Sequence, residues 1–435
     1  MTSKNKDLST VQPLVDIAAE ENKLFRDGYV KGIAEFIKEC ATPTTIAIQG
    51  DWGTGKTSLI NQIEKELRAG AKSAKNDNED AKKYCKEIIN VASFDVWKHY
   101  AANPHVDLPA GLLEEIASKL SGANLLKLGK VAEFVSSVSE VLGVVFGEED
   151  DKKDDSSFGS ILGMIFGSAD KSESSKSGEK DETASSEDVS SFQTMFVEAL
   201  DQCAKANGKS KDSRFVVIID GLDYISPEIT FDLMGLIKTY IDCPRCVIVF
   251  AVDKETVFSG VRKKLGDRID EGQQKRHFDR LVQVPLRIPT SACDLDEYVK
   301  YLLEDNKELS GQLVGVIGTL LSEPTPRRIK RYINMMYLYR SIFGESESAG
   351  DASLAMLLAA VILEMESAKG FDVVARCAQG DEAQFDESLK AALDSLGTSD
   401  GINWAMLPTL WQGGESADVD GAKRSAFISW ARKLK

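Results

Sequence analysis

The chain has 435 residues, of which 43% are hydrophobic, and a formal net charge of −16 at pH 7. This apolar fraction is ordinary for a globular protein with a substantial core and excludes general disorder. An acidic surface repels phosphate backbones and anionic lipids, so the overall charge argues against general nucleic-acid or membrane binding.

The seven cysteines are scattered along the chain, and only Cys243 and Cys246 form a CxxC pair. Because there is no second pair and only three histidines, no zinc site is expected, and Cys246 is expected to pack as a small core residue. The first 13 residues lack the apolar segment of a signal peptide. The apolar stretches 141–147 and 158–167 are shorter than the about 20 residues that span a bilayer. These features predict a cytoplasmic protein without a transmembrane segment.

In chain order, the first clear signal is a buried strand followed by glycines and a helix. Residues 45–49 are largely apolar, and residues 58–67 place Leu59, Ile63 and Leu67 on one helical face. A second strand is predicted at 88–94.

The loop between the first strand and the helix reads Gly-Asp-Trp-Gly-Thr-Gly-Lys-Thr, which fits the P-loop pattern. Glycines let the backbone N–H groups point at phosphates, and the positive end of the following helix adds to the attraction. Lys56 is expected to neutralise the β and γ oxygens, and the Thr57 hydroxyl is expected to hold Mg²⁺. This motif predicts binding of ATP, or alternatively GTP, with Mg²⁺. The predicted nucleotide-binding residues are Gly50, Asp51, Trp52, Gly53, Thr54, Gly55, Lys56, Thr57 and Ser58.

The composition changes at residues 147–188, which are dense in Ser, Gly, Lys, Asp and Glu. Such a tract cannot bury enough surface to offset its ordering entropy, so it predicts a disordered insertion on a surface loop. The apolar stretch 131–146 before it has helical spacing, which favours a helix that faces the core or a partner over one on a membrane surface.

After this tract, strands again alternate with helices. The uninterrupted apolar run 215–219 is typical of a strand covered on both faces of a parallel sheet. Ser226, Pro227 and Glu228 predict the start of a helix. Further strands are predicted at 247–252 and 281–286. This alternation predicts an α/β fold with a doubly wound parallel sheet.

Three acids follow the ends of these strands. Asp220 ends the apolar run 215–219, as expected of the carboxylate that a P-loop requires near Mg²⁺, and Asp223 follows it as a second catalytic candidate. Asp253 ends the next run, in the position of a γ-phosphate sensor, although a turn-forming Asp fits equally well. Because ligands bind at the carboxyl ends of parallel strands, these acids are expected to converge there.

Strand signals stop at about residue 294, and helical periods such as that of 354–365 follow. We therefore predict one P-loop domain formed by 1–146 and 189–293, interrupted by the insertion at 147–188. A helical domain is predicted at 294–435.

Several strings together resemble the KAP family of P-loop NTPases over roughly residues 15–370. They are GDWGTGKTSL, FDVW, VVIIDGLDYISPE, FAVDKETV, FDRLVQVPLRIP and TPRRIKRYIN. The resemblance implies that Thr57 and Asp220 are the metal-side ligands, that Lys56 binds phosphate, and that Asp253 is a sensor. It also implies that Arg327 reaches the nucleotide from the helical domain. Bacterial members of the family are associated with signalling and with defence against phage.

The sequence departs from the family pattern in two places. Where the family has two acids and later Leu-Asp-Arg, this chain has Asp220, Gly221, Leu222, Asp223 and Tyr224. The missing acid predicts slow hydrolysis, because in many such enzymes that side chain orients the attacking water. The insertion, secondly, lacks the membrane-spanning helices that some members carry.

These features predict a nucleotide-gated switch with slow Mg²⁺-dependent ATP hydrolysis and a protein partner or a second copy of the chain. One alternative is a scaffold that binds ATP without turnover. Another alternative is an AAA-type ATPase that remodels nucleic acid. The basic cluster at 327–331 could contact nucleic acid, but the overall acidity disfavours this alternative.

Overall fold

The structure is a computed structural model that describes part of the chain and divides it into two compact units. The first unit comprises residues 27–52 and 56–288, and the second comprises 289–435 with 1–26 and 53–55. The described residues are 14, 24–25, 27–73, 88–102, 108, 111–112, 115–116, 186–206, 208–210, 212–266, 268–289, 294–303, 307–322, 324–343, 351–396, 402–412 and 417–433. The predicted helix at 131–146 and nearly all of the predicted insertion therefore lie outside the described residues.

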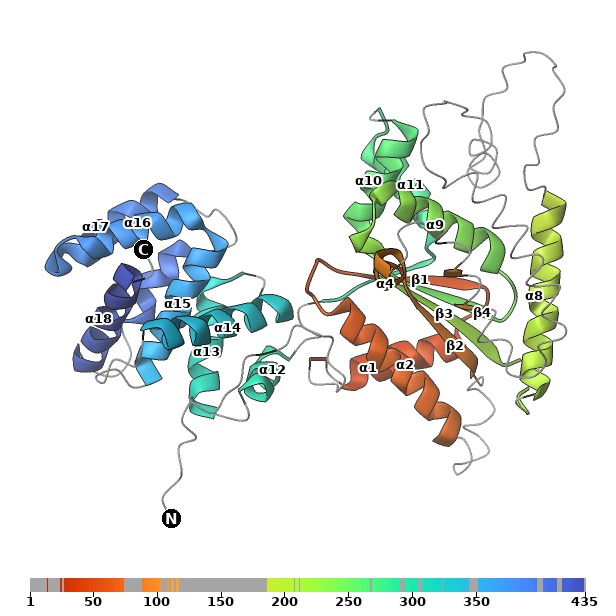
Figure 1. Ribbon diagram of the computed structural model, residues 1–435, viewed down its shortest axis with the longest axis horizontal. Coiled ribbons are helices and arrows are strands. Elements are labelled where there is room, and N and C mark those ends of the chain that lie inside the picture. Colours follow the sequence, from red (N-terminus) through yellow and green to blue (C-terminus); the bar gives the residue numbers. More distant parts are fainter. Residues whose placement is uncertain are drawn as a thin grey trace. The chain divides into compact units, whose positions relative to one another are not determined.

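The first unit is built on a parallel five-stranded sheet with the strand order β2-β3-β4-β1-β5 (Figure 1). The strands are β1 (Thr44–Gln49), β2 (Ile88–Asp95), β3 (Arg214–Asp220), β4 (Cys246–Ala251) and β5 (Val284–Arg287). Both β1 and β4 are buried along their whole length, as is β3 up to its last residue, which explains why they read as continuous apolar runs. The predicted doubly wound parallel sheet is confirmed.

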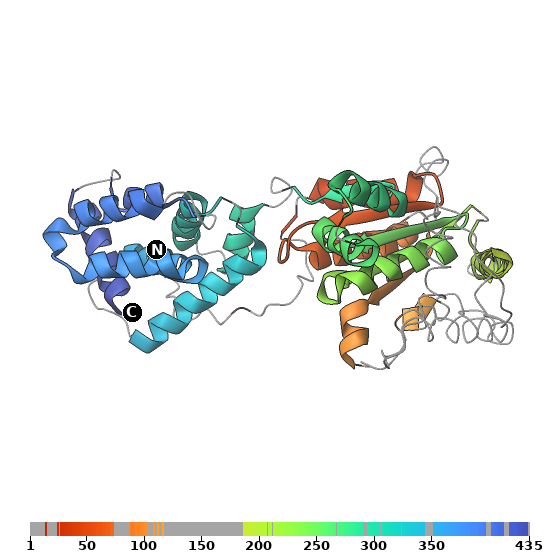
Figure 2. The same ribbon diagram turned by 90° about the horizontal axis from the view of Figure 1, so that it is seen from above.

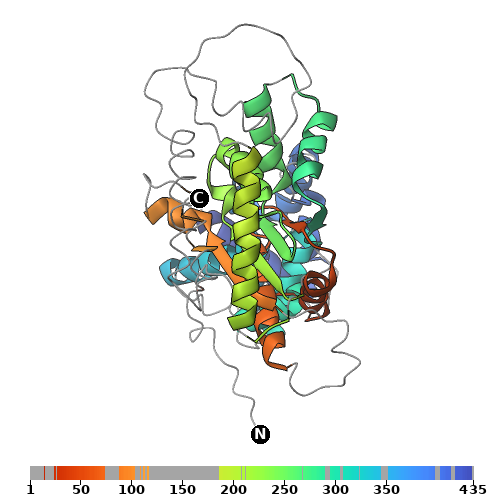
Figure 3. The same cartoon turned by 90° about the vertical axis from the view of Figure 1, so that its right-hand side faces the viewer.

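Helices cover both faces of this sheet. Figure 1 shows α1 (Asp27–Glu39) and α2 (Lys56–Ser73) on one side, with α9 (Pro227–Ile241), α10 (Lys254–Leu265) and α11 (Glu271–Leu281) on the other. The short helix α4 (Val96–Ala102) follows β2 directly. Helix α8 (Ser186–Ala206) contacts α9 and β2, and it is drawn in yellow-green in Figure 3. It begins at Ser186, so it includes the last three residues of the predicted insertion.

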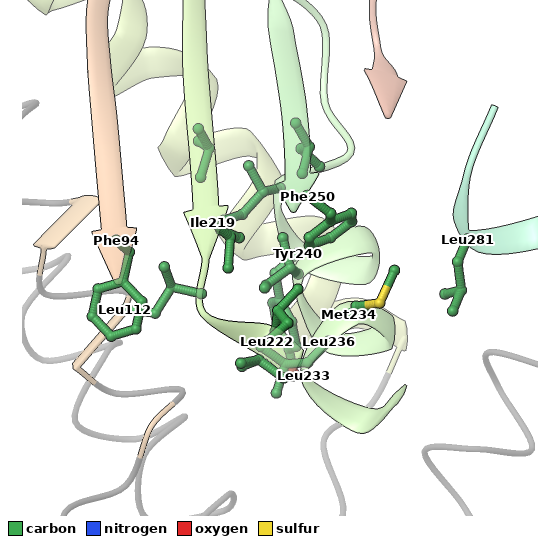
Figure 4. Packing of buried hydrophobic residues seen from close by; sticks show 14 of the residues in the cluster. Phe94, Leu112, Ile219, Leu222, Leu233, Met234, Leu236, Tyr240, Phe250 and Leu281 are labelled. Atoms are coloured by element: carbon green, nitrogen blue, oxygen red, sulfur yellow. The ribbon is translucent and has the colours of Figure 1, made fainter. Parts of the chain in front are cut away.

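The start of α9 agrees with the prediction from sequence. Ser226 is its N-cap and accepts a hydrogen bond from the Ile229 N–H, and Pro227 is the first helical residue. The apolar residues of α9, among them Leu233, Met234, Leu236 and Tyr240, belong to one buried cluster with the strand residues Ile219 and Phe250 (Figure 4). The helix is thus fixed by its cap and by apolar burial.

The strand predicted at 281–286 is wrong at its start. Asp270 and Gln273 form a capping box that begins α11, and this helix continues to Leu281. Leu281 is buried together with Phe278, one helical turn earlier, so the apolar residue belongs to the helix face. The strand β5 begins only at Val284, and its edge position tolerates Pro285.

A buried arginine ties α1 to the sheet. Arg214, the first residue of β3, is 1% exposed. Its guanidinium donates to the carbonyl oxygens of Ile37, at 2.9 Å, and Cys40. Because the last carbonyls of a helix have no partner within it, this contact satisfies the end of α1.

The second unit is helical, and Figure 2 gives a second view of it in cyan to dark blue. Its helices are α12 (Leu295–Leu302), α13 (Lys307–Leu320), α14 (Pro326–Phe343), α15 (Asp351–Glu366), α16 (Ala368–Gln379), α17 (Phe385–Leu396) and α18 (Ala417–Lys433). Helix α15, predicted at 354–365, contacts α13, α14, α16 and α18 and is buried from Ala355 to Leu363. None of the helices in the described part of the chain has the length and apolar character needed to cross a membrane.

Candidate nucleotide site

The P-loop joins the end of β1 to the start of α2. The strand ends at Gln49 and the helix begins at Lys56. Gly53 and Gly55 have φ angles of 87° and 97°, a region in which residues with a Cβ atom are strained. The glycines of the motif are therefore required by the path of the backbone at these positions.

Lys56 is held by three oxygen acceptors. Its Nζ donates to the Gly50 carbonyl oxygen at 2.5 Å and to the Asp51 carbonyl oxygen at 3.3 Å, and it forms an ion pair of 2.9 Å with Asp223 Oδ2. The side chains of Lys56 and Asp223 are only 9% and 11% exposed. An ammonium group has three donors, so these contacts fix its position at the mouth of the loop.

Asp223 connects three strand ends. Besides its ion pair with Lys56, which follows β1, its Oδ1 accepts a hydrogen bond of 2.7 Å from the backbone N–H of Asp253, which follows β4. Asp223 itself follows β3. In the structure these acids lie together at the carboxyl edge of the sheet, as the sequence predicted. The sequence did not indicate that Asp223 pairs with Lys56.

Asp253 is the N-cap of α10, where its side chain accepts a hydrogen bond of 3.3 Å from the Glu255 N–H. Burial raises the pKa of the Asp253 carboxyl, and the nearby charges of Asp223 and Asp51 add to this effect. The residue is close to the site, and its carboxylate caps α10, whereas the alternative that the sequence left open was a turn-forming Asp.

Thr57 and Asp220, the two predicted metal-side ligands, lie next to each other. The Thr57 side chain is hydrogen-bonded to the Asp220 carboxylate, and Asp220 Oδ1 accepts a further hydrogen bond of 2.8 Å from the Gly221 N–H. Burial raises the pKa of Asp220, and these hydrogen bonds oppose the rise. A hydroxyl and a carboxylate are oxygen ligands of the kind that Mg²⁺ prefers, so the donor set fits this ion.

An aromatic row flanks the loop. The Trp52 ring meets the Tyr224 ring edge-on at 6.5 Å between centroids, and Tyr224 meets Trp97 at 5.7 Å. All three are exposed, Trp52 to 60%. The sequence marked Trp52 as a P-loop residue and Trp97 through the family strings, and it gave no sign that Tyr224 joins them.

The remaining predicted residues lie on or beside the same loop, except one. Asp51 is exposed, Thr54 and Gly55 are half-buried in the loop, and Ser58 is half-buried in the first turn of α2. Arg327 is the second residue of α14, in the other compact unit, so its approach to the nucleotide stays a prediction. Among the described residues, no group of three or more His, Cys, Asp and Glu side chains forms a metal cluster.

The comparison with family models agrees with a P-loop at this position. The family model described as the KAP family P-loop domain matches residues 26–343. Among curated proteins, none matches the sequence. Several solved structures are distantly similar, among them the following two. "Structure of Drosophila ORC bound to DNA" has a TM-score of 0.41 at 11% identity and covers 99% of this chain and 88% of that chain. "Structure of the Aeropyrum Pernix ORC2 protein (ADPNP-ADP complexes)" has a TM-score of 0.36 at 12% identity and covers 98% of this chain and 99% of that chain. TM-scores this low say nothing of what this chain binds.

Proposed function

This chain belongs to the KAP family of P-loop domains, and we propose that it is an ATP-binding switch with slow Mg²⁺-dependent hydrolysis. GTP is the second candidate nucleotide. One observation carries the proposal. The glycines of the loop, Lys56, Thr57 and Asp220 occupy adjoining positions at the carboxyl edge of the sheet, each with the chemistry that a triphosphate with Mg²⁺ requires.

Each residue has its own part in this proposal. Lys56 binds the β and γ oxygens and exchanges its ion pair with Asp223 for the phosphate when nucleotide enters. Thr57 and Asp220 hold Mg²⁺, which when bound neutralises charge on the phosphates. Before nucleotide enters, Asp223 keeps Lys56 in place and links it to the Asp253 backbone.

The switch itself concerns the helical unit. Arg327 on α14 is the residue that we propose reaches the nucleotide from the helical unit, so that the bound nucleotide controls the state of that unit. A protein partner or a second copy of the chain then receives this change. The family resemblance supports this part of the proposal.

The proposal is tested by comparing the rate of ATP hydrolysis with the affinity for ATP in the same preparation. Binding of labelled ATP and GTP, with and without Mg²⁺, is measured beside phosphate release from the same preparation. We expect Mg²⁺-dependent binding and turnover below roughly one per minute, under the usual enzyme range. Binding with no phosphate release, even when Mg²⁺ and ATP saturate, would instead identify a scaffold. Stimulation by DNA with a steep salt dependence would favour the nucleic-acid alternative.

A further inference from the structure

Asp95 lies beside the predicted metal-side carboxylate although its sequence position gives no sign of this. It is the last residue of β2, and the parallel register of β2 and β3 places it opposite Asp220, the last residue of β3. The charge of Asp95 contributes to the raised pKa of Asp220, after the larger effect of burial. The two neighbouring strands therefore each end in an aspartate, and the two aspartates lie side by side at the site.

Gly221 makes room for the Asp95 carboxylate. Its φ angle is 81°, and a Cβ atom added there would lie 3.0 Å from Asp95 Oδ1 and 2.9 Å from the Trp97 backbone nitrogen. A side chain at Gly221 would thus crowd the Asp95 carboxylate. The acid that the family pattern places after Asp220 is missing from the sequence, and an acid from the neighbouring strand stands beside that position.

The Asp95 side chain has a fixed orientation. Its Oδ1 accepts a hydrogen bond of 3.0 Å from the Lys98 N–H, which caps α4, and its Oδ2 forms an ion pair of 2.9 Å with Lys98 Nζ. A carboxylate has about four lone-pair positions, so both oxygens can still accept from a water molecule. An acceptor whose direction is already fixed costs less to organise at the moment of reaction.

We infer that Asp95 is the water-orienting residue of this site, an inference that rests on the proposed ATP hydrolysis. Asp95 accepts a hydrogen bond from the attacking water. The water oxygen bonds to the γ-phosphorus while the bond from that phosphorus to the bridging oxygen breaks. The electron pair of the broken bond stays on the β-phosphate of the ADP, and the proton of the water passes to the released phosphate.

Asp95→Asn separates this role from helix capping. Asparagine caps helices as well as aspartate, so α4 should keep its start, whereas the charge that aligns the water is lost. Asp270→Asn is the matched control, because Asp270 caps α11 through the same kind of hydrogen bond, from the Gln273 N–H, and takes no part in the phosphate site. Melting temperature, ATP affinity, phosphate release and affinity for ADP with aluminium fluoride are measured for each protein.

We expect Asp95→Asn to bind ATP as the wild type does. Its phosphate release and its affinity for ADP with aluminium fluoride should both fall at least tenfold, at the low end of general acid–base effects. The Asp270→Asn control should match the wild type. The fluoride complex mimics the transferring phosphoryl group, so this affinity reports on the role even if turnover of the wild type is too slow to follow.

Two results would overturn the inference in different ways. Unchanged fluoride-complex affinity and turnover in Asp95→Asn would show that Asp95 only caps α4, while the proposed function would stand. A wild-type protein that binds no ATP would overturn the proposed function, and this inference with it.

Discussion

The ion pair between Lys56 and Asp223 predicts that the phosphate-binding lysine also stabilises the fold. At 2.9 Å and an effective dielectric constant of about 20, the attraction between two unit charges is about 6 kcal/mol. Desolvation of two side chains that are only 9% and 11% exposed offsets much of this. Lys56→Met keeps the apolar stem but leaves the Asp223 carboxylate without its cation, so we expect the free energy of unfolding to fall by about 2–3 kcal/mol.

A double-mutant cycle tests this value. Urea denaturation without nucleotide is followed for the wild type, Lys56→Met, Asp223→Asn and the double variant. Asparagine at 223 can still accept from the Asp253 N–H, so the double variant should be less destabilised than the sum of the two single variants, by about 1–3 kcal/mol. Additive effects within about 0.5 kcal/mol would refute the reasoning, because they would mean that the two groups do not stabilise each other.

Three further changes have defined outcomes. Gly221→Asp restores the family pattern, and from sequence alone it should speed hydrolysis. The φ angle of 81° and the nearby Trp97 nitrogen instead predict that the free energy of unfolding, measured by urea denaturation, falls by about 1–3 kcal/mol and that phosphate release is no faster. Faster turnover at full stability would contradict this. Burial raises the pKa of Asp232 to about 6 despite its ion pair with Lys264, so the folded state binds the proton more tightly than the unfolded state. Relative to Asp232→Asn, the free energy of unfolding of the wild type should fall by up to about 3 kcal/mol as pH rises from 4 to above 6. A difference between the two proteins that does not change with pH would contradict this. Arg214→Leu leaves the last carbonyls of α1 unpaired and should cost about 2–4 kcal/mol in urea denaturation, whereas a loss below about 0.5 kcal/mol would show that water replaces the guanidinium.

The parts of the candidate site whose positions follow from the sequence are local. The P-loop is a contiguous motif whose glycines, lysine and threonine follow one strand and precede one helix, so its geometry is determined within a few residues. Asp220 could be predicted because a buried parallel strand is a continuous apolar run, and an acid at the end of that run lies at the edge where ligands bind.

The parts that the sequence did not predict depend on contacts between distant segments. Asp95 approaches Gly221 only because β2 and β3 pair in one particular register. The partner of Lys56 could not be chosen among the acids near the strand ends, because the choice depends on how the short turn after β3 is folded. The misplaced strand at 281–286 had a different cause. Leu281 is apolar in either reading, and the capping box at Asp270 that assigns it to α11 lies eleven residues earlier.

Nucleotide binding by the P-loop is the central claim, and calorimetric titration of Mg·ATP into wild type and Lys56→Met tests it most directly. Far-UV circular dichroism at the same temperature establishes that both proteins are folded, since the variant is expected to be less stable. The account predicts a dissociation constant in the range of about 1 µM to 1 mM for the wild type and no measurable heat of binding for Lys56→Met. Equal affinity in the two folded proteins would contradict the account, because the phosphate would then bind without the lysine around which the site is built.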